Sequence, residues 1–472
     1  MRRLHRTNCA GAKTALMHKR VTSSRRAIPS VAKVLDSLGK IDLPRPLIVD
    51  LVRRELSAIR AEDKIPEGGS IVDLVRDSLD KFRASRLQPI INGTGIVIHT
   101  NFGRSPMANE TTKAVREIAS SYNNLEHDLV SGGRGRRGAY LEQALALLCR
   151  AEAATIVNNC AAALVLIVRY LIKTKSEVII SRGEMIQIGG GFRIGDILES
   201  TGAQLREVGA TNKTTTTDYA RAINKQTALI LKIHRSNFFM SGFVQSPSAA
   251  ELAGLARKKH IPFVEDLGSG AVVATEQFGV TEHEPTPAEA LKDGADLVCF
   301  SSDKLFGGPQ AGIIAGKKRF IAALKREPLF RALRCDKLIF AALQATVDLH
   351  LNQATSEIPA LALLQISKDE LRARAAAILA RLRGLPPQIT VGRGTAKVGG
   401  GTLPRSTMSS ITIDIFPENC SVQDFASILR RSTPPVVGYV ANERFKLDLR
   451  TIFPNQDDAV VDAIRTACAT TH

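Results

Sequence analysis

The feature that most constrains the fold of this chain is a regular alternation between residues 90 and 345. Short apolar runs of strand length are separated there by helix-length segments, which predicts an α/β fold with a mostly parallel seven-stranded sheet. In such sheets, ligands gather at the carboxyl ends of the strands. The seven expected strands are Thr155–Val157, Glu177–Ile180, Leu205–Val208, Ala228–Ile233, Ile261–Val264, Leu297–Phe300 and Gly312–Ala315.

The alternation also divides the 472 residues into segments. Residues 1–27 form a basic arm with eight Lys or Arg and no acid. This arm could be a flexible extension, a targeting presequence, or the product of a start site assigned upstream of Met17. We expect a small helical unit at 28–88, a large α/β domain at 89–345 and a smaller α+β domain at 346–472.

Two amphipathic helices are predicted in the 28–88 unit, because apolar residues recur at helical spacing over 47–59 and 71–82. Ser70 and Asp73 have the spacing of a capping box at the start of the second helix. The exposed faces could be ordinary solvated surface or a docking surface for an anionic partner. The cations on these faces are Arg53, Arg54, Arg60, Arg76, Lys81, Arg83 and Arg86.

The 346–472 segment begins with a long helix, Lys368–Arg383, followed by a glycine-rich stretch at 392–401. Two strand-like segments follow at 410–415 and 445–449. Helices are expected at 421–431 and 456–468.

Composition excludes several classes of protein. The longest uninterrupted apolar run, Cys160–Val168, is far shorter than the about 20 residues of a membrane-spanning helix. The seven cysteines have no CxxC spacing and the histidines no HxxxH pair, so we expect neither disulfides nor a metal site, and a cytoplasmic location. The formal charge of +18 suggests a polyanionic partner, nucleic acid above all.

A lysine and an aspartate follow two of the expected strands. Lys304 comes soon after Leu297–Phe300 and precedes a Gly-Gly-Pro turn, and Asp266 comes just after Ile261–Val264. A lysine amine can form a Schiff base. Pyridoxal phosphate (PLP) enzymes need such a lysine together with a carboxylate on the pyridine nitrogen. The pair therefore indicates a PLP site.

A third element could hold the phosphate of that cofactor. Asn159, Cys160 and Ala161 follow the strand Thr155–Val157 and open an apolar helix. The N-terminus of a helix offers free backbone N–H groups to an anion. Ser301, beside the lysine, could add a hydroxyl.

These motifs, taken together, resemble those of bacterial selenocysteine synthase, which is L-seryl-tRNA(Sec) selenium transferase and has the aspartate-aminotransferase fold type. The resemblance runs from about Ile28 to the C-terminus and leaves residues 1–27 uncovered. It is carried by SSDKLFGGPQAG, VEDLGSG, NNCAAA, INGTGIVIHTNFGRSPM, YNNLEHDL, GGGFRIGDI, LKIHRSNF, LRRSTPPVVGYV and LDLRTIFP.

The resemblance implies a reaction and a set of roles. Lys304 would bind PLP and Asp266 would pair with its ring nitrogen. Serine carried by tRNA(Sec) would lose its α-proton and hydroxyl, giving a PLP-bound aminoacrylate to which selenium from selenophosphate adds. The family's selenophosphate-binding arginines correspond to Arg104, Arg331 and Arg334. Guanidinium groups suit an oxyanion because they donate paired N–H groups.

Further implications concern Asp303 and the partners. Asp303 matches an acidic family position and would assist proton transfer. The family forms a homo-oligomer, a ring of dimers, and grips tRNA through its N-terminal helical domain. Residues 28–88 match that domain in position, and we expect them to match it in basic character as well. Neither DNA nor a membrane is an expected partner.

Four positions depart from the family pattern. Arg136, Gly138 and Tyr140 replace Ser, Tyr and His, and Cys160 replaces Asn. These changes would matter if the side chains line the cofactor pocket or a dimer contact. Two rival functions remain open: a tRNA-independent PLP lyase of the same fold that acts on a small amino acid, and a tRNA-binding protein without catalysis.

Overall fold

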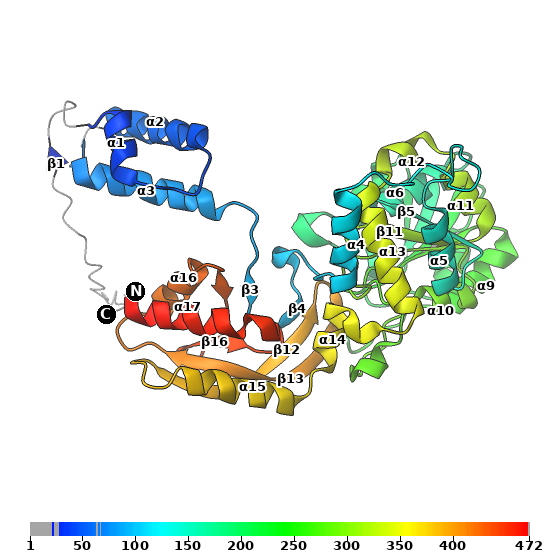
Figure 1. Cartoon of the computed structure of the whole chain (residues 1–472). Coiled ribbons are helices and arrows are strands. Elements are labelled where there is room, and N and C mark those ends of the chain that lie inside the picture. Colours follow the sequence, from blue (N-terminus) through cyan, green and yellow to red (C-terminus); the bar gives the residue numbers. More distant parts are fainter. Residues whose placement is uncertain (1–20, 23–27, 63–64, 67, 471–472) are drawn as a thin grey trace, which may run out of the picture. The chain divides into compact units, whose positions relative to one another are not determined.

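The structure is a computed structural model that describes residues 21–22, 28–62, 65–66 and 68–470 (Figure 1). It divides into two compact units, residues 1–89 and 90–472. The basic arm predicted at 1–27 lies outside the described residues apart from Val21–Thr22. No helix in the described part of the chain is both long enough and apolar enough to cross a bilayer.

The first unit is a small bundle of three helices with its own apolar core. Its helices are α1 (Val31–Leu38), α2 (Arg45–Ala61) and α3 (Gly68–Ala84), and a two-residue ladder joins β1 (Val21–Thr22) to β2 (Ile65–Pro66). Val34, Leu56 and Val75 are fully buried, one from each helix. The two predicted amphipathic helices are therefore present, and α1 joins them.

The predicted capping box at the start of the second helix is wrong. Helix α3 begins at Gly68, so Ser70 lies inside its first turn and is not the residue that precedes it. Sequence reasoning placed the start too late because Gly68 and Gly69 are poor helix formers.

The second unit contains the predicted seven-stranded sheet, in the order β5-β11-β10-β9-β8-β6-β7. All neighbouring strands are parallel except β11, which runs antiparallel to both β10 and β5. All seven predicted strands are confirmed. Their bounds are β5 Ala153–Val157, β6 Glu177–Ser181, β7 Gln204–Val208, β8 Thr227–Ile233, β9 Phe263–Asp266, β10 Leu297–Ser301 and β11 Gly312–Gly316.

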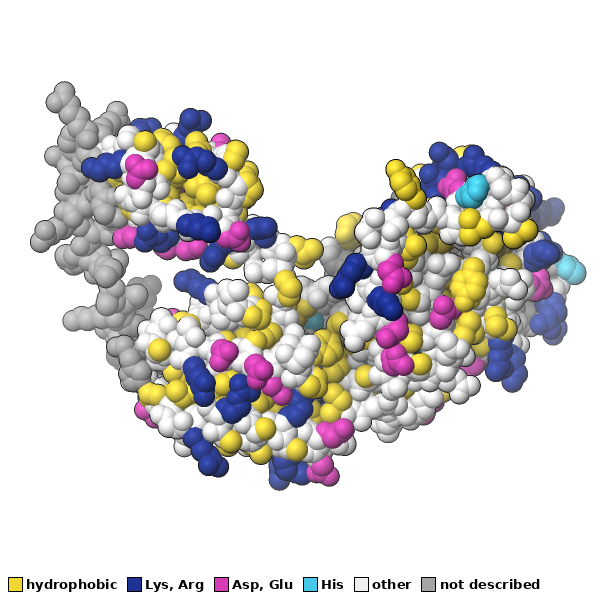
Figure 2. Space-filling view, in the orientation of Figure 1, with side chains coloured by type: hydrophobic (Ala, Val, Ile, Leu, Met, Phe, Trp, Pro, Cys, Tyr) yellow, Lys and Arg dark blue, Asp and Glu magenta, His cyan; other side chains and the backbone are white. Residues whose placement is uncertain are grey.

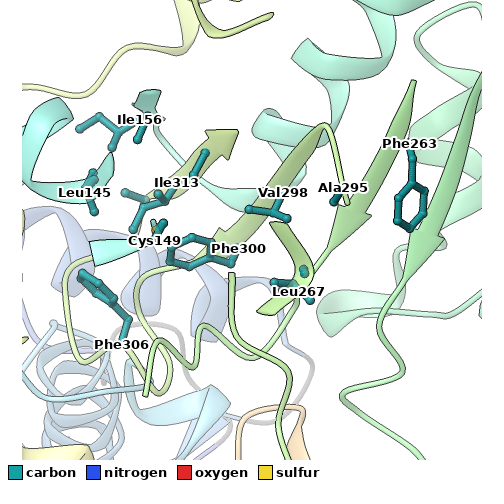
Figure 3. Close-up of a cluster of buried hydrophobic side chains, with 14 of the residues drawn as sticks. Leu145, Cys149, Ile156, Phe263, Leu267, Ala295, Val298, Phe300, Phe306 and Ile313 are labelled. Atoms are coloured by element: carbon teal, nitrogen blue, oxygen red, sulfur yellow. The ribbon is translucent and has the colours of Figure 1, made fainter. Parts of the chain in front are cut away.

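Helices cover both faces of this sheet, because successive side chains of each strand point to opposite faces. In β6, Ile179 packs in one apolar cluster, shown in Figure 3, and Ile180 packs in the other. The first cluster includes side chains from α5 (Ala139–Leu148), α8 (Thr216–Ala222), α9 (Ala249–Lys259), α10 (Pro287–Asp293) and α13 (Lys337–Leu351). The second includes side chains from α6 (Cys160–Leu171), α7 (Ile194–Glu199) and α11 (Lys318–Leu324).

A second, five-stranded sheet lies in the C-terminal part of the chain, in the order β15-β16-β13-β12-β4. Its inner face carries Ile411, Ile413 and Ile415 against helices α15, α16 and α17. The bounds are β4 Ile96–Ile98, β12 Gln388–Gly399, β13 Thr402–Phe416, β15 Tyr439–Ala441, β16 Arg444–Asp448, α15 Lys368–Arg381, α16 Val422–Arg430 and α17 Asp457–Thr470. The remaining elements are β3 Ile91–Asn92, β14 Val436–Val437, α4 Asn109–Ala119, α12 Pro328–Leu333 and α14 Pro359–Gln365.

The glycine-rich stretch of this region turns out to be most of strand β12, which the sequence did not indicate. A Cβ on Gly392 would lie 2.3 Å from Asp414, and one on Gly394 would lie 2.6 Å from Asp448. Both acids are buried on the outer face of the sheet, where Asp414 pairs with Lys446 at 2.5 Å. Glycine is used here because only a backbone without Cβ can pass these carboxylates.

Candidate active site

Lys304 lies in a tight loop after β10, which is next to the central strand β9 of the large sheet. The backbone N–H of Gly308 donates to the carbonyl of Ser302 at 2.8 Å, which closes this loop. The Lys304 amine donates to the carbonyl of Gly268 at 2.7 Å. Burial lowers the pKa of the amine, although Cys160, Asp266 and Asp303 oppose the shift. A lowered pKa favours the uncharged amine that forms a Schiff base.

Asp266 ends the neighbouring strand β9 and is 9% exposed. Its printed side-chain partners are two thiols: Cys160 Sγ lies 3.3 Å and Cys299 Sγ 3.8 Å from Oδ1. Burial raises the pKa of the Asp266 carboxyl, and the thiols and Lys304 only partly offset that effect. A cationic ring nitrogen beside this carboxylate would stabilise its ionised form.

The start of helix α6 has the geometry of an anion site. Asn159 precedes the helix, and its Oδ1 accepts a hydrogen bond from the N–H of Ala162 at 2.8 Å. Within the residues that the structure describes, the N–H groups of Cys160 and Ala161 have no acceptor. A Cβ on Gly312 would lie 2.1 Å from the Asn159 carbonyl, so β11 can approach this turn only through a glycine.

Asp303 and Arg104 form an ion pair one residue from the lysine. The Asp303 side chain is 8% exposed and that of Arg104 is 39% exposed. Arg104 has φ of +67°, a left-handed conformation that is uncommon for a residue with a Cβ. The pair spans 199 residues of sequence, so the arginine reaches the lysine loop only through the tertiary fold.

Arg331 and Arg334 both line a separate cavity of about 600 Å³. Arg331 belongs to α12 and Arg334 directly follows that helix. Arg334 lies 3.6 Å from Glu126. In the part of the chain that the structure describes, no hydrogen bond or ion pair joins either arginine to Lys304 or Asp303. The structure therefore groups Lys304, Asp266, Asn159, Cys160, Ala161, Asp303 and Arg104, and not Arg331 and Arg334.

Ser301, the last residue of β10, makes no side-chain hydrogen bond among the described residues. Its carbonyl would lie 2.1 Å from a Cβ on Gly270. Gly270 has φ of +71°, and the loop after Asp266 therefore packs against the lysine strand without a side chain between them.

Sequence reasoning missed two ionisable groups beside this site, the half-buried His234 and the buried Glu284. Nδ1 of His234 lies 3.4 Å from Oε1 of Glu284. Burial lowers the pKa of His234 to about 4 and raises that of Glu284 to about 7, and the charge of Lys304 acts on both. The position of His234 right after strand β8, in the motif LKIHRSNF, was the available signal.

The departures at 136, 138 and 140 occupy the start of α5. A Cβ on Gly138 would lie 2.0 Å from the ring of Phe340, so this ring takes the space beside the backbone. The hydroxyl of Tyr140 donates to Asp348 at 2.6 Å. Arg136 is exposed and lies 3.6 Å from Glu142.

Comparison with known proteins gives a consistent picture. The sequence profile of the family described as L-seryl-tRNA selenium transferase (SelA) matches residues 90–453. Two similar relatives are both named L-seryl-tRNA(Sec) selenium transferase. The one from Geobacter sulfurreducens is 42% identical over 93% of this chain and 98% of its own. The one from Carboxydothermus hydrogenoformans is 42% identical over 92% and 95%.

Among solved structures, a D-glucosaminate-6-phosphate ammonia-lyase has a similar fold. It superposes with a TM-score of 0.56 over 82% of this chain and 97% of its own, at 20% sequence identity. This likeness supports the fold of the large unit.

Proposed function

This chain belongs to the L-seryl-tRNA selenium transferase family, and we propose that it converts L-seryl-tRNA(Sec) to L-selenocysteinyl-tRNA(Sec) with selenophosphate as the selenium donor. Its cofactor is pyridoxal phosphate. The observation that carries the proposal is the meeting of Lys304 and Asp266 at the ends of adjacent parallel strands. Reaction on a tRNA places the enzyme in the cytoplasm.

The residues present fit the cofactor at three points. The buried carboxylate of Asp266 has only weak thiol donors as side-chain partners, so it could pair with a cationic ring nitrogen. The free N–H groups of Cys160 and Ala161 suit a phosphate. The amine of Lys304 is the third point, and Gly401, which has φ of +73°, lies beside it.

Bound pyridoxal phosphate withdraws electrons from the α-carbon of an attached amino acid, which lets the α-proton and the β-substituent leave. Lys304 would hold the cofactor, and its Nζ, when free, would accept the α-proton of the bound serine. Asp266 keeps the ring nitrogen protonated. Asp303 can move a proton at the lysine loop, since it lies beside Lys304.

Arg104 binds the selenium-bearing anion. Its guanidinium pairs with Asp303, so an anion that approaches it competes with that carboxylate. Arg331 and Arg334 complete the anion site in our proposal. Because they line a different cavity of this chain, they would act in an active site shared between subunits, which agrees with a ring of dimers. Size-exclusion chromatography with light scattering tests the assembly, and a monomer would contradict it.

The helical unit at 28–88 is the proposed tRNA contact, but its overall charge gives no support. It contains eleven Lys or Arg and ten Asp or Glu, so the expectation of a basic unit is wrong. Opposite charges are mixed over its surface in Figure 2. Arg54, Arg76, Arg83 and Arg86 are paired with carboxylates.

What supports the contact is a smaller set of cations. Arg53 and Arg60 lie seven residues apart, on one face of α2, and neither has an ion-pair partner among the described residues. The relative from Geobacter sulfurreducens aligns with 93% of this chain, so the unaligned part is shorter than 28–88, and at least part of the unit is shared with a protein named for tRNA(Sec).

A direct assay tests the activity. Purified protein is mixed with selenophosphate and either seryl-tRNA(Sec) or a non-cognate seryl-tRNA, and the esterified amino acid is identified. We expect conversion of the first tRNA only, loss of activity in Lys304→Ala and full activity in the exposed-lysine control Lys292→Ala. Turnover of a free amino acid with neither tRNA converted would favour the lyase. A protein that binds tRNA but no cofactor would favour the non-catalytic alternative.

A charge-reversal pair tests the docking face. Arg53→Glu with Arg60→Glu removes two unpaired cations, and Arg54→Glu with Arg76→Glu makes the same charge change at two paired ones. We expect the first pair alone to weaken tRNA binding and to lower the salt slope by about two, since each phosphate contact contributes about one. Equal effects of the two pairs would contradict the assignment.

A further inference from the structure

The cofactor site contains a group of three metal-ligand side chains, of which the proposed reaction uses only that of Asp266. Cys160, Asp266 and Cys299 place two sulfurs and a carboxylate oxygen within 4.8 Å of one another. Asp266 and Cys299 are buried, and Cys160 is half-buried. The three residues come from separate elements, so no spacing motif in the sequence reveals them.

The backbone fixes two of these side chains next to each other. Asp266 and Cys299 are register partners in the parallel strands β9 and β10, so their side chains leave the sheet on the same face. Cys160 is the first residue of α6, directly after the Asn159 cap, and its thiol donates to Asp266. The arrangement therefore depends on strands and a capped helix, which hold ligands more firmly than loops do.

The distances match those of a thiophilic cation in tetrahedral coordination. Zinc binds sulfur at about 2.3 Å and carboxylate oxygen at about 2.0–2.2 Å, which separates two sulfurs by about 3.8 Å and a sulfur and an oxygen by about 3.5 Å. The two sulfur–oxygen distances here are 3.3 and 3.8 Å, and the sulfurs lie within 4.8 Å of each other. Little movement is needed to bind an ion.

The chemistry of the three side chains also favours a thiophilic cation. Two thiols with a carboxylate form a soft ligand set that prefers Zn²⁺ to Mg²⁺ or Ca²⁺. Burial raises the pKa of Asp266, and the pKa values of the Cys160 and Cys299 thiols are also raised, so the protonated forms are favoured when no cation is bound. A bound dication would take the thiol protons' place and stabilise the anions.

We propose that Cys160, Cys299 and Asp266 bind Zn²⁺, and that this ion and pyridoxal phosphate exclude each other because both require Asp266. The ion takes three protein ligands and leaves a fourth position open. The metal site itself does not depend on the proposed function, whereas the competition rests on the role proposed there for Asp266. Cys160 is a departure from the family pattern, so the site is a property of this chain.

Titration of the full-length protein with Cd²⁺, an optical stand-in for Zn²⁺, tests the proposal. We expect sulfur-to-cadmium absorbance at one ion per chain, together with loss of the absorbance of the lysine-bound cofactor. Zn²⁺ should displace the Cd²⁺ signal. Cys160→Asn, which restores the usual family residue, and Cys299→Ala should each weaken binding by about tenfold or more, because each removes one sulfur ligand.

Cys149→Ala is the matched control, because Cys149 is a buried thiol outside the cluster. It should bind Cd²⁺ as the wild type does. Unchanged Cd²⁺ absorbance in both cluster variants would overturn the site, as would a disulfide between Cys160 and Cys299 in the purified protein. Cd²⁺ binding without cofactor release would overturn the exclusion, whatever the outcome of the tRNA assay.

Discussion

Replacing Asn159 by aspartate separates the two roles that the structure gives this position. Asn159 caps α6 through its bond to the N–H of Ala162. Aspartate caps helices as well as asparagine does, and a negative charge at a helix N-terminus is favourable. We therefore expect Asn159→Asp to keep the melting temperature of the wild type, and Asn159→Ala to lose about 1 kcal/mol.

Asn159→Asp should nevertheless weaken the binding of the cofactor. An anion held by the N–H groups of Cys160 and Ala161 would lie within one helical turn, about 5.4 Å, of the new carboxylate. Repulsion between two unit charges at that distance is about 3 kcal/mol at an effective dielectric constant of about 20 and about 0.8 kcal/mol in bulk water. Pyridoxal phosphate should therefore bind between about 4-fold and about 200-fold more weakly.

The assay is an equilibrium titration of cofactor-depleted protein, read from the absorbance of the lysine-bound cofactor at low and high salt. Pyridoxal, which lacks the phosphate, is the control ligand, and its affinity should be the same for wild type and Asn159→Asp. Wild-type affinity of Asn159→Asp for pyridoxal phosphate, with an unchanged melting temperature, would refute the placement of the phosphate at α6.

Three further predictions concern stability. Burial raises the pKa of Glu265 to about 7, above its usual 4.5, so the folded protein retains this proton and loses stability as the pH rises from about 4.5 through 7. Glu265→Gln should remove up to about 3 kcal/mol of that loss, measured by urea unfolding at two pH values. Parallel pH profiles of the wild type and the variant would contradict this prediction. Gly138→Tyr, which restores the family residue, should destabilise the protein because of the positive φ and the Phe340 ring, and Phe340→Ala should partly rescue it; additive losses would argue against this contact. Lys446→Met leaves the buried Asp414 without its cation and should cost about 3–5 kcal/mol by chemical denaturation, with a smaller loss when Asp414→Asn is added. A loss below about 1 kcal/mol would contradict this prediction.

Much of the site was predictable because it depends on strand ends. Parallel strands bring their carboxyl ends to one edge of a sheet, so the meeting of Asp266 and Lys304 follows once the seven strands are recognised. The start of α6 was predictable for the same reason, since it directly follows β5. Helices α2 and α3 of the 28–88 unit followed from apolar spacing, whereas α1 was not predicted.

The remaining contacts depend on tertiary geometry that spacing does not encode. Arg104 contacts Asp303 across 199 residues, and its own backbone is in the left-handed region. The contact between Cys299 and Asp266 could not be predicted from the sequence, because it depends on the register of the two strands. The strand character of 392–399 was hidden by its glycines, of which Gly392 and Gly394 lie against the buried Asp414 and Asp448.

Two strands from the beginning of the second unit pair with strands near the C-terminus, and this has a consequence during synthesis on the ribosome. Ile91 of β3 pairs with Val436 of β14, and Ile96 of β4 pairs with Lys397 of β12. At about 5–20 residues per second, β3 waits about 17–70 s for its partner to be translated. The 28–88 helices can fold in that time from local contacts, while the apolar segment 91–98 stays unpaired. We expect this segment to be the part of the nascent chain that most needs a chaperone.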